Sequence, residues 1–166
     1  MDGKKGHPRP PRSSAGRKSM KKKKQKKNVP FAFIQDFGTY QDDMFVIVGA
    51  KSREDIVKVA KSARIKKSLI KYLSEGDIGT DFKEAGSIVS FTQDGTENMV
   101  LFLHYWKNCW DFWETLMHEL HHVVHFHIAV ARRMEKEAEA LAYQQEYLFR
   151  SIRRKLQGTR KFKKYT

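Results

Sequence analysis

The 166-residue sequence contains one cysteine, Cys109, and so cannot form an intrachain disulfide. Small secreted domains usually depend on several disulfides, and this composition disfavours that class. No apolar run approaches the roughly 20 residues that a membrane-spanning helix needs. The basic N-terminal segment is followed by no apolar stretch of the kind that marks a secretory signal. We therefore expect a protein that is not secreted and has no membrane partner, located in the cytoplasm or on nucleoprotein.

Acidic residues are scarce at both ends of the chain. Residues 1–28 contain 12 lysines and arginines and one acid, and residues 150–166 contain eight and none. Polycationic segments bind polyanions because neutralised phosphates release their condensed counterions. We therefore expect a nucleic acid or nucleoprotein partner, with an unstructured solubilising role as the alternative. The side chains expected to make these contacts are Lys21, Lys22, Lys23, Lys24, Lys26, Lys27, Arg153, Arg154 and Lys155.

Composition divides the chain into three parts. Residues 1–29 combine prolines, serines and glycines with a lysine run, and such segments cannot bury enough apolar surface to fold. Residues 30–157 carry the periodic apolar patterns and are long enough for one modest core. Residues 158–166 form a second basic tail. The sequence thus predicts one folded domain between two basic tails.

Apolar periodicity predicts an α+β domain in which a small sheet is followed by two long helices. Strands are expected at 31–37, 44–48, 87–91 and 98–105, with a tight turn at Asp94–Gly95 between the last two. Helices are expected at 53–63, 65–73, 112–131 and 134–156. Ser52 is the expected N-cap of the first helix, and Gly158 is expected to end the last. The continuously apolar run 99–103 predicts a strand buried on both faces.

The segment His118–His122 reads H-E-L-H-H and matches the pattern H-E-x-x-H. Residues four apart share one face of a helix, so His118 and His122 can present two imidazoles to one zinc ion. Glu119 lies beside the expected metal and is the candidate base that takes a proton from a zinc-bound water. The alternative is a histidine-rich amphipathic helix whose imidazoles are only hydrogen-bonded.

Residues 115–122 read T-L-M-H-E-L-H-H and resemble the T-L-x-H-E-L-x-H helix of gluzincin-like peptidases, including the ImmA/IrrE group and the minimal gluzincins. Residues 137–142 read E-A-E-A-L-A and are similar to the E-A-x-x-[FL]-A pattern of that family's glutamate helix. The resemblance covers about residues 101–147. It implies a small zincin-like domain with a short β-sheet, a zinc-binding helix and a C-terminal glutamate helix that supplies the third ligand.

Glu137 is the favoured third ligand, because the resemblance points to it and because it flanks the apolar face of the last helix. In one unbroken helix, 15 residues would separate it from His122 by about 22 Å. A shared zinc ion therefore requires a break, which we expect within 128–133, although neither glycine nor proline occurs there. Glu135, His125 or no third protein ligand are the alternatives. A second metal on His121 and His125 is a further one.

Other candidate residues have weaker signals. Tyr105 or Tyr143 could stabilise the oxyanion of a tetrahedral intermediate. His104, at the end of a strand, is expected to be structural, and Cys109 is expected to be a buried thiol. His127 is read as a surface or packing residue. The three- and four-residue spacing of Trp106, Trp110 and Trp113 favours core packing over base stacking.

Three functions follow from these patterns. The first is a zinc-dependent metallopeptidase that hydrolyses peptide bonds in a protein or peptide, with Zn²⁺ as cofactor. The second is a non-catalytic nucleic-acid-associated or virion structural protein on a zincin-like scaffold with polycationic tails. The third is a metal site used for another reaction. The basic stretch 51–71 is compatible with either a substrate cleft or a polyanion-binding surface.

Overall fold

The computed structural model describes residues 29–38, 43–63, 65–76, 78, 82–93, 96–107 and 109–159, without the side chains of residues 93, 96, 97 and 131. The N-terminal segment with its six predicted polyanion-binding lysines lies outside the described residues. So do the Asp94–Gly95 turn and most of the C-terminal tail. None of the helices in the described part of the chain is both long and apolar enough to cross a membrane.

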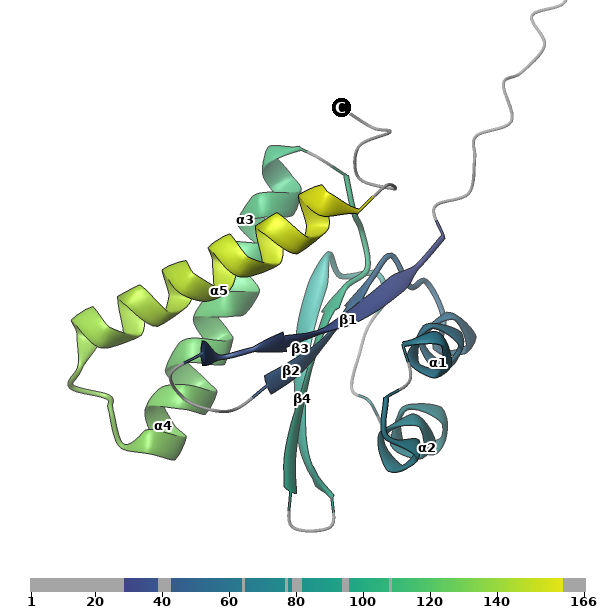
Figure 1. Ribbon diagram of the computed structural model, residues 1–166, viewed down its shortest axis with the longest axis horizontal. Helices are drawn as coiled ribbons and strands as arrows, with labels where there is room; N and C mark the ends of the chain where they lie inside the picture. Colours follow the sequence, from purple (N-terminus) through teal and green to yellow (C-terminus); the bar gives the residue numbers. More distant parts are fainter. Residues whose placement is uncertain are drawn as a thin grey trace, which may run out of the picture.

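The architecture is mixed α/β, with a four-stranded sheet at its centre (Figure 1). The strands are β1 (Phe31–Asp36), β2 (Asp43–Val48), β3 (Gly86–Gln93) and β4 (Thr96–Leu103), in the order β1-β2-β4-β3. β1 pairs with β2 and β3 pairs with β4 in antiparallel fashion, whereas β2 and β4 are parallel. The parallel pair requires a crossover, which runs through the first two helices. The two outer strands, β1 and β3, are the edges of the sheet.

The central strands are buried on both faces, as the apolar run 99–103 predicted. Alternate residues contribute to two separate clusters, because successive side chains of a strand point to opposite faces. Met44, Val46 and Leu101 belong to one cluster. Ile47 and Phe102 belong to the other. The sheet therefore separates two helical layers, each with its own core.

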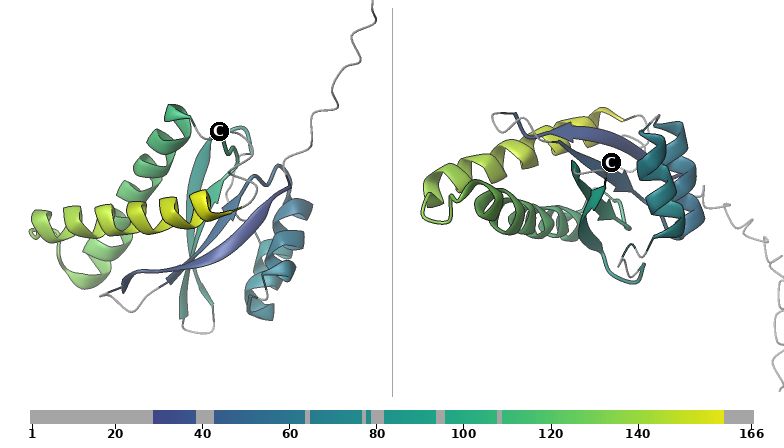
Figure 2. Two further views of the ribbon diagram at one scale, coloured as in Figure 1. Left: turned by 45° about the horizontal axis from the view of Figure 1, so that its top comes forward. Right: turned by 90° about the horizontal axis from the view of Figure 1, so that it is seen from below.

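Helices α1 (Arg53–Ser62) and α2 (Lys67–Glu75) cover one face of the sheet (Figure 2). The predicted cap is confirmed, because the Ser52 hydroxyl accepts a hydrogen bond from the Asp55 backbone N–H at 3.3 Å. The apolar stripes of both helices pack against the sheet. Their buried residues are Ile56, Val59, Ala60, Leu69 and Leu73.

Helices α3 (Trp110–His122), η2 (Val123–Ile128), α4 (Ala129–Arg132) and α5 (Ala138–Gly158) cover the opposite face (Figures 1 and 2). The first three are continuous, with η2 wound as a π-helix. The helix then ends at Arg133, whose φ of 54° is left-handed, and the chain turns back through residues 134–137 into α5. The predicted break is therefore confirmed. It is made by a non-glycine residue in the conformation that glycine usually provides at a helix end.

Several boundaries differ from the prediction, most of them by one or two residues, and three of the differences concern the last two predicted helices. The HExxH helix begins at Trp110 with Cys109 as N-cap residue, two residues earlier than expected. The last helix begins at Ala138 rather than at residue 134, because the preceding residues form the reversal. Gly158 is the last residue of α5 instead of following it, and Thr159 is the C-cap.

Helix α5 is fastened along the edge strand β1. The buried Gln144 side chain donates a hydrogen bond to the Phe37 carbonyl at 3.0 Å, and the Lys155 ammonium donates to the Ile34 carbonyl at 2.8 Å. The Tyr147 hydroxyl donates to the Asp36 carboxylate at 2.9 Å. Side chains of α5 thus bind the backbone and the end of this strand.

Candidate metal and catalytic site

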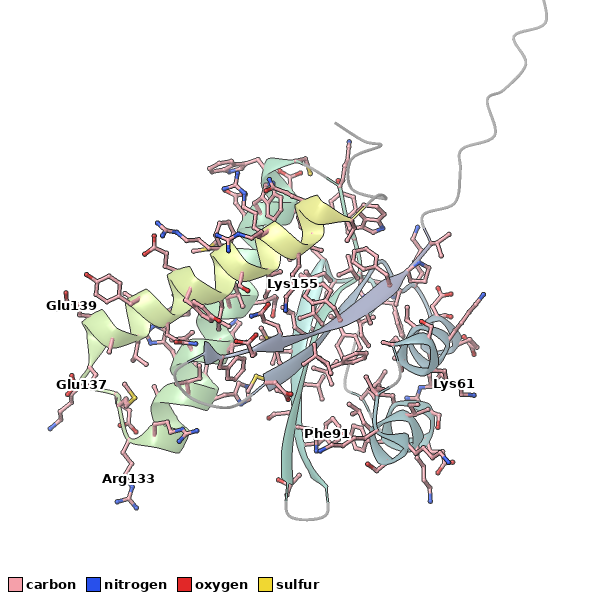
Figure 3. The ribbon with its side chains drawn as sticks, in the orientation of Figure 1. Lys61, Phe91, Arg133, Glu137, Glu139 and Lys155 are labelled. Carbon is pink, nitrogen blue, oxygen red and sulfur yellow. The ribbon has the colours of Figure 1, made fainter. Side chains whose placement is uncertain are left out.

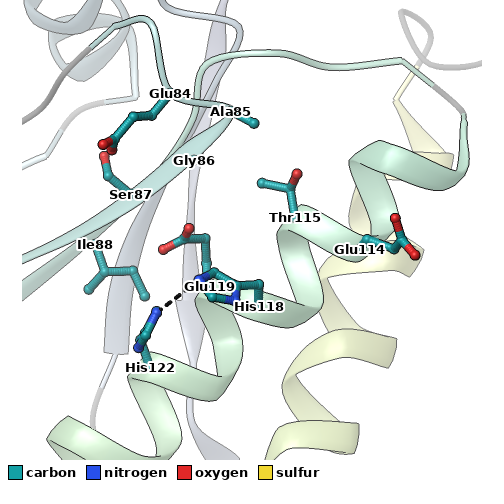
Figure 4. Close-up of a pocket in the computed structure, with 10 residues that line it drawn as sticks. All are labelled: Glu84, Ala85, Gly86, Ser87, Ile88, Glu114, Thr115, His118, Glu119 and His122. Carbon is teal, nitrogen blue, oxygen red and sulfur yellow. Dashed lines mark hydrogen bonds between the residues drawn. The ribbon is translucent and has the colours of Figure 1, made fainter.

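His118 and His122 converge on one point, one helical turn apart on α3. Their Nε2 atoms are 3.0 Å apart, and their ring planes are perpendicular (Figure 4). Two nitrogens at this separation can each lie about 2.0–2.1 Å from one ion. In the absence of an ion, the same contact is a hydrogen bond in which one ring donates and the other accepts. The geometry therefore fits two ligands of a metal and is equally compatible with the hydrogen-bonded alternative.

The electrostatics of His122 suit a metal ligand. Burial lowers its pKa from the ordinary histidine value, and the neighbouring His118, His121 and His127 lower it further. A lowered pKa favours the neutral imidazole at pH 7, which is the form that binds metals.

Glu119 is buried, with only 7% of its surface exposed. Its carboxylate forms no hydrogen bond or ion pair with any residue in the described part of the chain. Burial raises its pKa, His118 lowers it and the negative charge of Glu84 raises it, and the net shift is upward. The carboxylate oxygens themselves face the pocket and are not sealed from it. This carboxylate is therefore accessible to a ligand or a reaction partner that enters the pocket.

A pocket of about 590 Å³ lies between α3 and the edge strand β3. Both histidines and Glu119 line it from the helix (Figure 4). The opposite wall is the start of β3 and the residues before it. The remaining lining residues are Glu84, Ala85, Gly86, Ser87, Ile88, Glu114 and Thr115. They include two further carboxylates and no lysine or arginine, in a chain whose net charge is +14.

Gly86 allows β3 to approach α3 closely enough to form this pocket. A Cβ at this position would lie 2.9 Å from Thr115 Cγ2, a distance that real Cβ atoms essentially do not adopt, and 3.0 Å from Glu119 Cγ, which is tighter than most real contacts. A strand glycine often marks a close approach of this kind. The position of the Glu119 side chain therefore depends on the absence of a side chain at Gly86.

The structure does not bring Glu137 to the histidine pair. It is exposed at the N-cap position of α5, at the outer end of the reversal (Figure 3). Glu135 is exposed in the same turn. Within the described ranges, no three histidine, cysteine, aspartate or glutamate side chains are grouped closely enough to hold a metal. The third-ligand assignment therefore stays a prediction.

The packing register of α5 explains this separation. The Gln145 side chain donates a hydrogen bond to the Met117 carbonyl at 3.2 Å, which places position 145 beside the HExxH segment. Glu137 lies eight residues earlier, about 12 Å along the helix axis. The π-helical segment η2 and α4 carry the chain past His122 before it reverses, and the predicted glutamate remains at that distant end.

Two of the three remaining histidines of α3 and η2, His121 and His125, form a second, less convergent pair. The His121 and His125 rings stack with centroids 4.2 Å apart and planes tilted by 34°. Neither residue lines the pocket. The exposed Phe126 packs against the His122 ring, with the ring centroids 5.3 Å apart. The alternative metal pair thus lies outside the pocket that contains Glu119.

The other candidates lie away from the pocket. Tyr105 bonds Cys109 Sγ through its hydroxyl at 3.4 Å, and Tyr143 is exposed on α5. Cys109 is half-buried rather than buried. His104 is buried, with Nδ1 3.1 Å from the Ala50 carbonyl oxygen. These positions give no support to an oxyanion role for either tyrosine.

The tryptophans differ from one another. Trp106 is buried and Trp113 packs against the core, as predicted. Trp110 is 73% exposed, and the prediction that it packs in the core is wrong. Its position in the first turn of α3 directs the indole to the surface, where its N–H donates to the Glu114 carboxylate.

The basic residues predicted to bind a polyanion near the C-terminus lie on α5. Arg153 stacks over the Trp113 ring at 5.5 Å, and Lys155 lies over the Phe33 ring as well as bonding Ile34. Arg154 is exposed. Two of the three side chains therefore have intramolecular contacts that hold α5 in place.

Glu84 and Gly86 are the site residues that the sequence did not reveal. The contact between β3 and α3 is tertiary and leaves no periodic signal, although a glycine at the start of a strand is a weak indication of close approach. Comparison of the chain with protein-family models, with curated proteins and with solved structures gives no match. The functional assignment therefore depends on the geometry of the pocket.

Proposed function

We propose that the chain is a zinc-dependent metallopeptidase on a zincin-like scaffold. The observation that carries the proposal is the 3.0 Å approach of the two Nε2 atoms beside the Glu119 carboxylate, which faces a pocket at a sheet edge. His118 and His122 are the two ligands from α3. A zinc ion held there would supply a Lewis acid that lowers the pKa of a bound water and polarises a substrate carbonyl.

Glu119 is the proposed general base. Its position next to His118 puts its carboxylate in the pocket while leaving it off the line of the two imidazoles. Its raised pKa moves it toward the range in which a carboxylate can accept a proton during attack and return it to the leaving amine. The Glu119 Oε atoms therefore hold the proton between the two steps.

The proposed substrate is an extended peptide segment that binds along β3. This strand has no strand neighbour on its outer side within the described sheet, and its first residues form a wall of the pocket. An edge strand offers backbone groups to an incoming chain, and this is a common way to hold a peptide. The carboxylates of Glu84 and Glu114 favour basic side chains in that segment.

Metal content tests the ligand pair. Purified full-length protein is expected to hold one zinc per chain by elemental analysis. The variant with His118→Ala and His122→Ala is expected to lose it, because both proposed α3 ligands are removed. The variant with His121→Ala and His125→Ala is the matched control, with the same chemistry and spacing outside the pocket, and is expected to retain it. Equal metal loss in both variants would overturn the assignment.

Identifying the third zinc ligand requires a comparison of two glutamates. Glu137 is the residue predicted from the sequence, and Glu84 is the carboxylate already in the pocket wall. Glu137→Ala is structurally cheap, because the side chain makes no capping hydrogen bond. A tenfold or larger rise in the zinc dissociation constant for one variant and not the other would identify the ligand.

Catalysis is tested separately with Glu119→Gln. This isosteric change keeps the side-chain shape but removes the ability to accept a proton. Hydrolysis of a lysine- and arginine-containing peptide library is expected to fall by about 10²–10⁴-fold with zinc content unchanged. Full retention of hydrolysis would exclude Glu119 as the base.

A non-catalytic nucleic-acid-associated protein is the second candidate. The observation in its favour is the row of exposed lysines on α1 and α2, remote from the pocket. Under this alternative, the histidine pair is a structural or hydrogen-bonded feature. Wild-type protein would then hydrolyse no peptide in the library, whether or not it contains zinc.

A further inference from the structure

The layer formed by α1 and α2 carries a dense group of exposed lysines. The stretch from residue 51 to 76 has three described acids, Glu54, Asp55 and Glu75, and seven described bases. Six of those bases are lysines whose side chains are exposed and form no ion pair with any other described residue. They are Lys51, Lys58, Lys61, Lys66, Lys67 and Lys71.

Helical spacing places these lysines next to one another. Lys58 and Lys61 are three apart on α1, and Lys67 and Lys71 are four apart on α2, so each pair lies on one helix face. The two helices pack side by side on the sheet (Figure 1). Like charges at such spacing repel one another, and an anionic partner relieves that repulsion.

A recess of about 440 Å³ marks the groove between the two helices. Lys58, Lys61 and Arg53 line it, with Glu54 as the one acid. Arg53 is held in place by a hydrogen bond from Nη1 to the Ser74 carbonyl at 3.3 Å, which ties α1 to α2. A fixed guanidinium beside two free ammonium groups suits the oxygens of a phosphate.

This layer lies on the opposite face of the sheet from the metal and catalytic site. The apolar residues under α1 and α2 belong to one core cluster, and those under α3 belong to the other. Figure 3 shows Lys61 on the outer side of the layer, away from the sheet. The basic stretch 51–71 therefore does not belong to the pocket with His118, and both surfaces can be occupied at the same time.

The exposed side chains of the layer favour a nucleic acid over an anionic membrane surface as its partner. None of the large hydrophobic side chains that are exposed in the described residues lies on α1 or α2. A helix that binds a membrane surface presents apolar side chains for insertion, and here that face is buried against the sheet. The one aromatic residue of α2, Tyr72, stacks on Phe91 at 3.6 Å and is therefore not available to stack on a base.

We propose that the α1–α2 layer is a nucleic-acid-binding surface that contacts the phosphate backbone without reading bases. Lys58, Lys61 and Lys71 make the contacts together with Arg53. The proposal does not rest on peptidase activity, because it concerns the other face of the sheet.

Salt-dependent binding tests the proposal. Full-length protein and its variants are titrated into a fluorescent 30-base-pair DNA duplex of mixed sequence between about 50 and 200 mM NaCl. The first variant combines Lys58→Gln, Lys61→Gln and Lys71→Gln. The matched control combines Lys107→Gln, Arg133→Gln and Lys136→Gln, which removes the same charge from exposed positions outside the layer.

The α1–α2 variant is expected to bind at least tenfold more weakly near 0.1 M salt. Its slope of log affinity against log salt should fall by about 2–3, because each lost phosphate contact contributes about 0.9. The control should stay within about threefold of wild type. A loss of equal size in both variants would overturn the proposal, because the effect would then follow net charge alone. An unchanged α1–α2 variant would overturn it too.

Two further measurements distinguish the charge of the layer from its folding, and DNA from a membrane surface. Replacing the same three lysines with arginine keeps the charge and the helix propensity, so binding should be retained. Loss of binding in that variant would show that a structural effect was responsible. Binding to phosphatidylcholine vesicles with about a fifth phosphatidylserine is measured in parallel. If the glutamine variant loses vesicle binding and keeps DNA binding, the surface is a membrane site and the proposal is wrong.

Discussion

The two edge strands of the sheet, β1 and β3, differ in what lies beside them. β1 is covered by α5, whose side chains donate to the Ile34 and Phe37 carbonyls and contact the Asp36 carboxylate. β3 has no strand on its outer side in the described sheet, and its first residues form a wall of the histidine pocket beside α3. Exposed strand edges invite pairing with other chains, and natural proteins usually block them. An edge left open beside a candidate catalytic site indicates where a peptide can bind.

The largest effect is expected from a substitution at Gly86, where β3 contacts α3. Gly86→Ala should displace β3 from α3, because the new Cβ would meet Thr115 Cγ2 and Glu119 Cγ. We expect a destabilisation of about 1–3 kcal/mol. Peptide hydrolysis should fall by at least tenfold, because a displaced Glu119 no longer meets the reacting groups at the required distance. Urea unfolding and steady-state kinetics measure the two effects.

Two controls identify the cause. Gly158→Ala adds the same atom where nothing lies within 4 Å, and it should leave stability and hydrolysis within error or slightly improve stability. Thr115→Ser removes the Cγ2 atom but keeps the hydroxyl that donates to the Asp111 carbonyl. Combined with Gly86→Ala, it should restore part of the loss. A double variant as impaired as Gly86→Ala alone would show that this contact is not responsible.

Substitutions that remove contacts between α5 and the covered edge should lower stability without affecting catalysis. Gln144→Leu removes the donor to the Phe37 carbonyl and leaves a polar group unsatisfied next to the core. The expected loss is about 1–3 kcal/mol, seen as a lower urea midpoint with an unchanged slope. Gln145→Leu, which breaks a less buried bond on the same helix, is the control and should cost less. Reduced hydrolysis in the folded Gln144→Leu protein would contradict the separation of the two edges.

The same comparison explains what the sequence could predict. Strand and helix patterns depend on local periodicity, and the Ser52 cap, the doubly buried run 99–103 and the break near Arg133 all have local or geometric signals. The convergence of His118 and His122 follows from helical spacing alone. The pocket wall does not, because the approach of Gly86 to α3 is a long-range contact.

The predicted glutamate helix shows the limit of the motif argument. Residues 137–142 match a family pattern, and α5 does fold back beside α3. The register between the two helices, however, is set by contacts such as the one between Gln145 and Met117, which no periodicity encodes. This register leaves Glu137 at the distant end, and a motif gives no information about it.

The smallest expected effect is the pH dependence of the stability contributed by the Tyr147–Asp36 hydrogen bond at the covered edge. The hydrogen bond from Tyr147 lowers the pKa of Asp36, and the same bond raises the pKa of Tyr147. A lowered carboxyl pKa stabilises the fold above about pH 4, and this contribution is lost as the pH falls through the folded value. A raised phenol pKa stabilises the fold below about pH 10, and that contribution is lost as the pH rises through the folded value.

The stability difference between wild type and Tyr147→Phe should therefore be constant from about pH 5 to pH 9 and shrink outside that window. Both side chains are exposed, so the plateau should be only a few tenths of a kcal/mol. Asp36→Asn tests the acidic limb, because a neutral amide has no carboxyl titration to lose and its stability should vary less below pH 4. A Tyr147→Phe difference that persists undiminished at pH 3 would show that α5 is held to β1 by packing and by its neutral hydrogen bonds. The covered edge would then differ from the open one in packing and neutral hydrogen bonds, and not in the charge of Asp36.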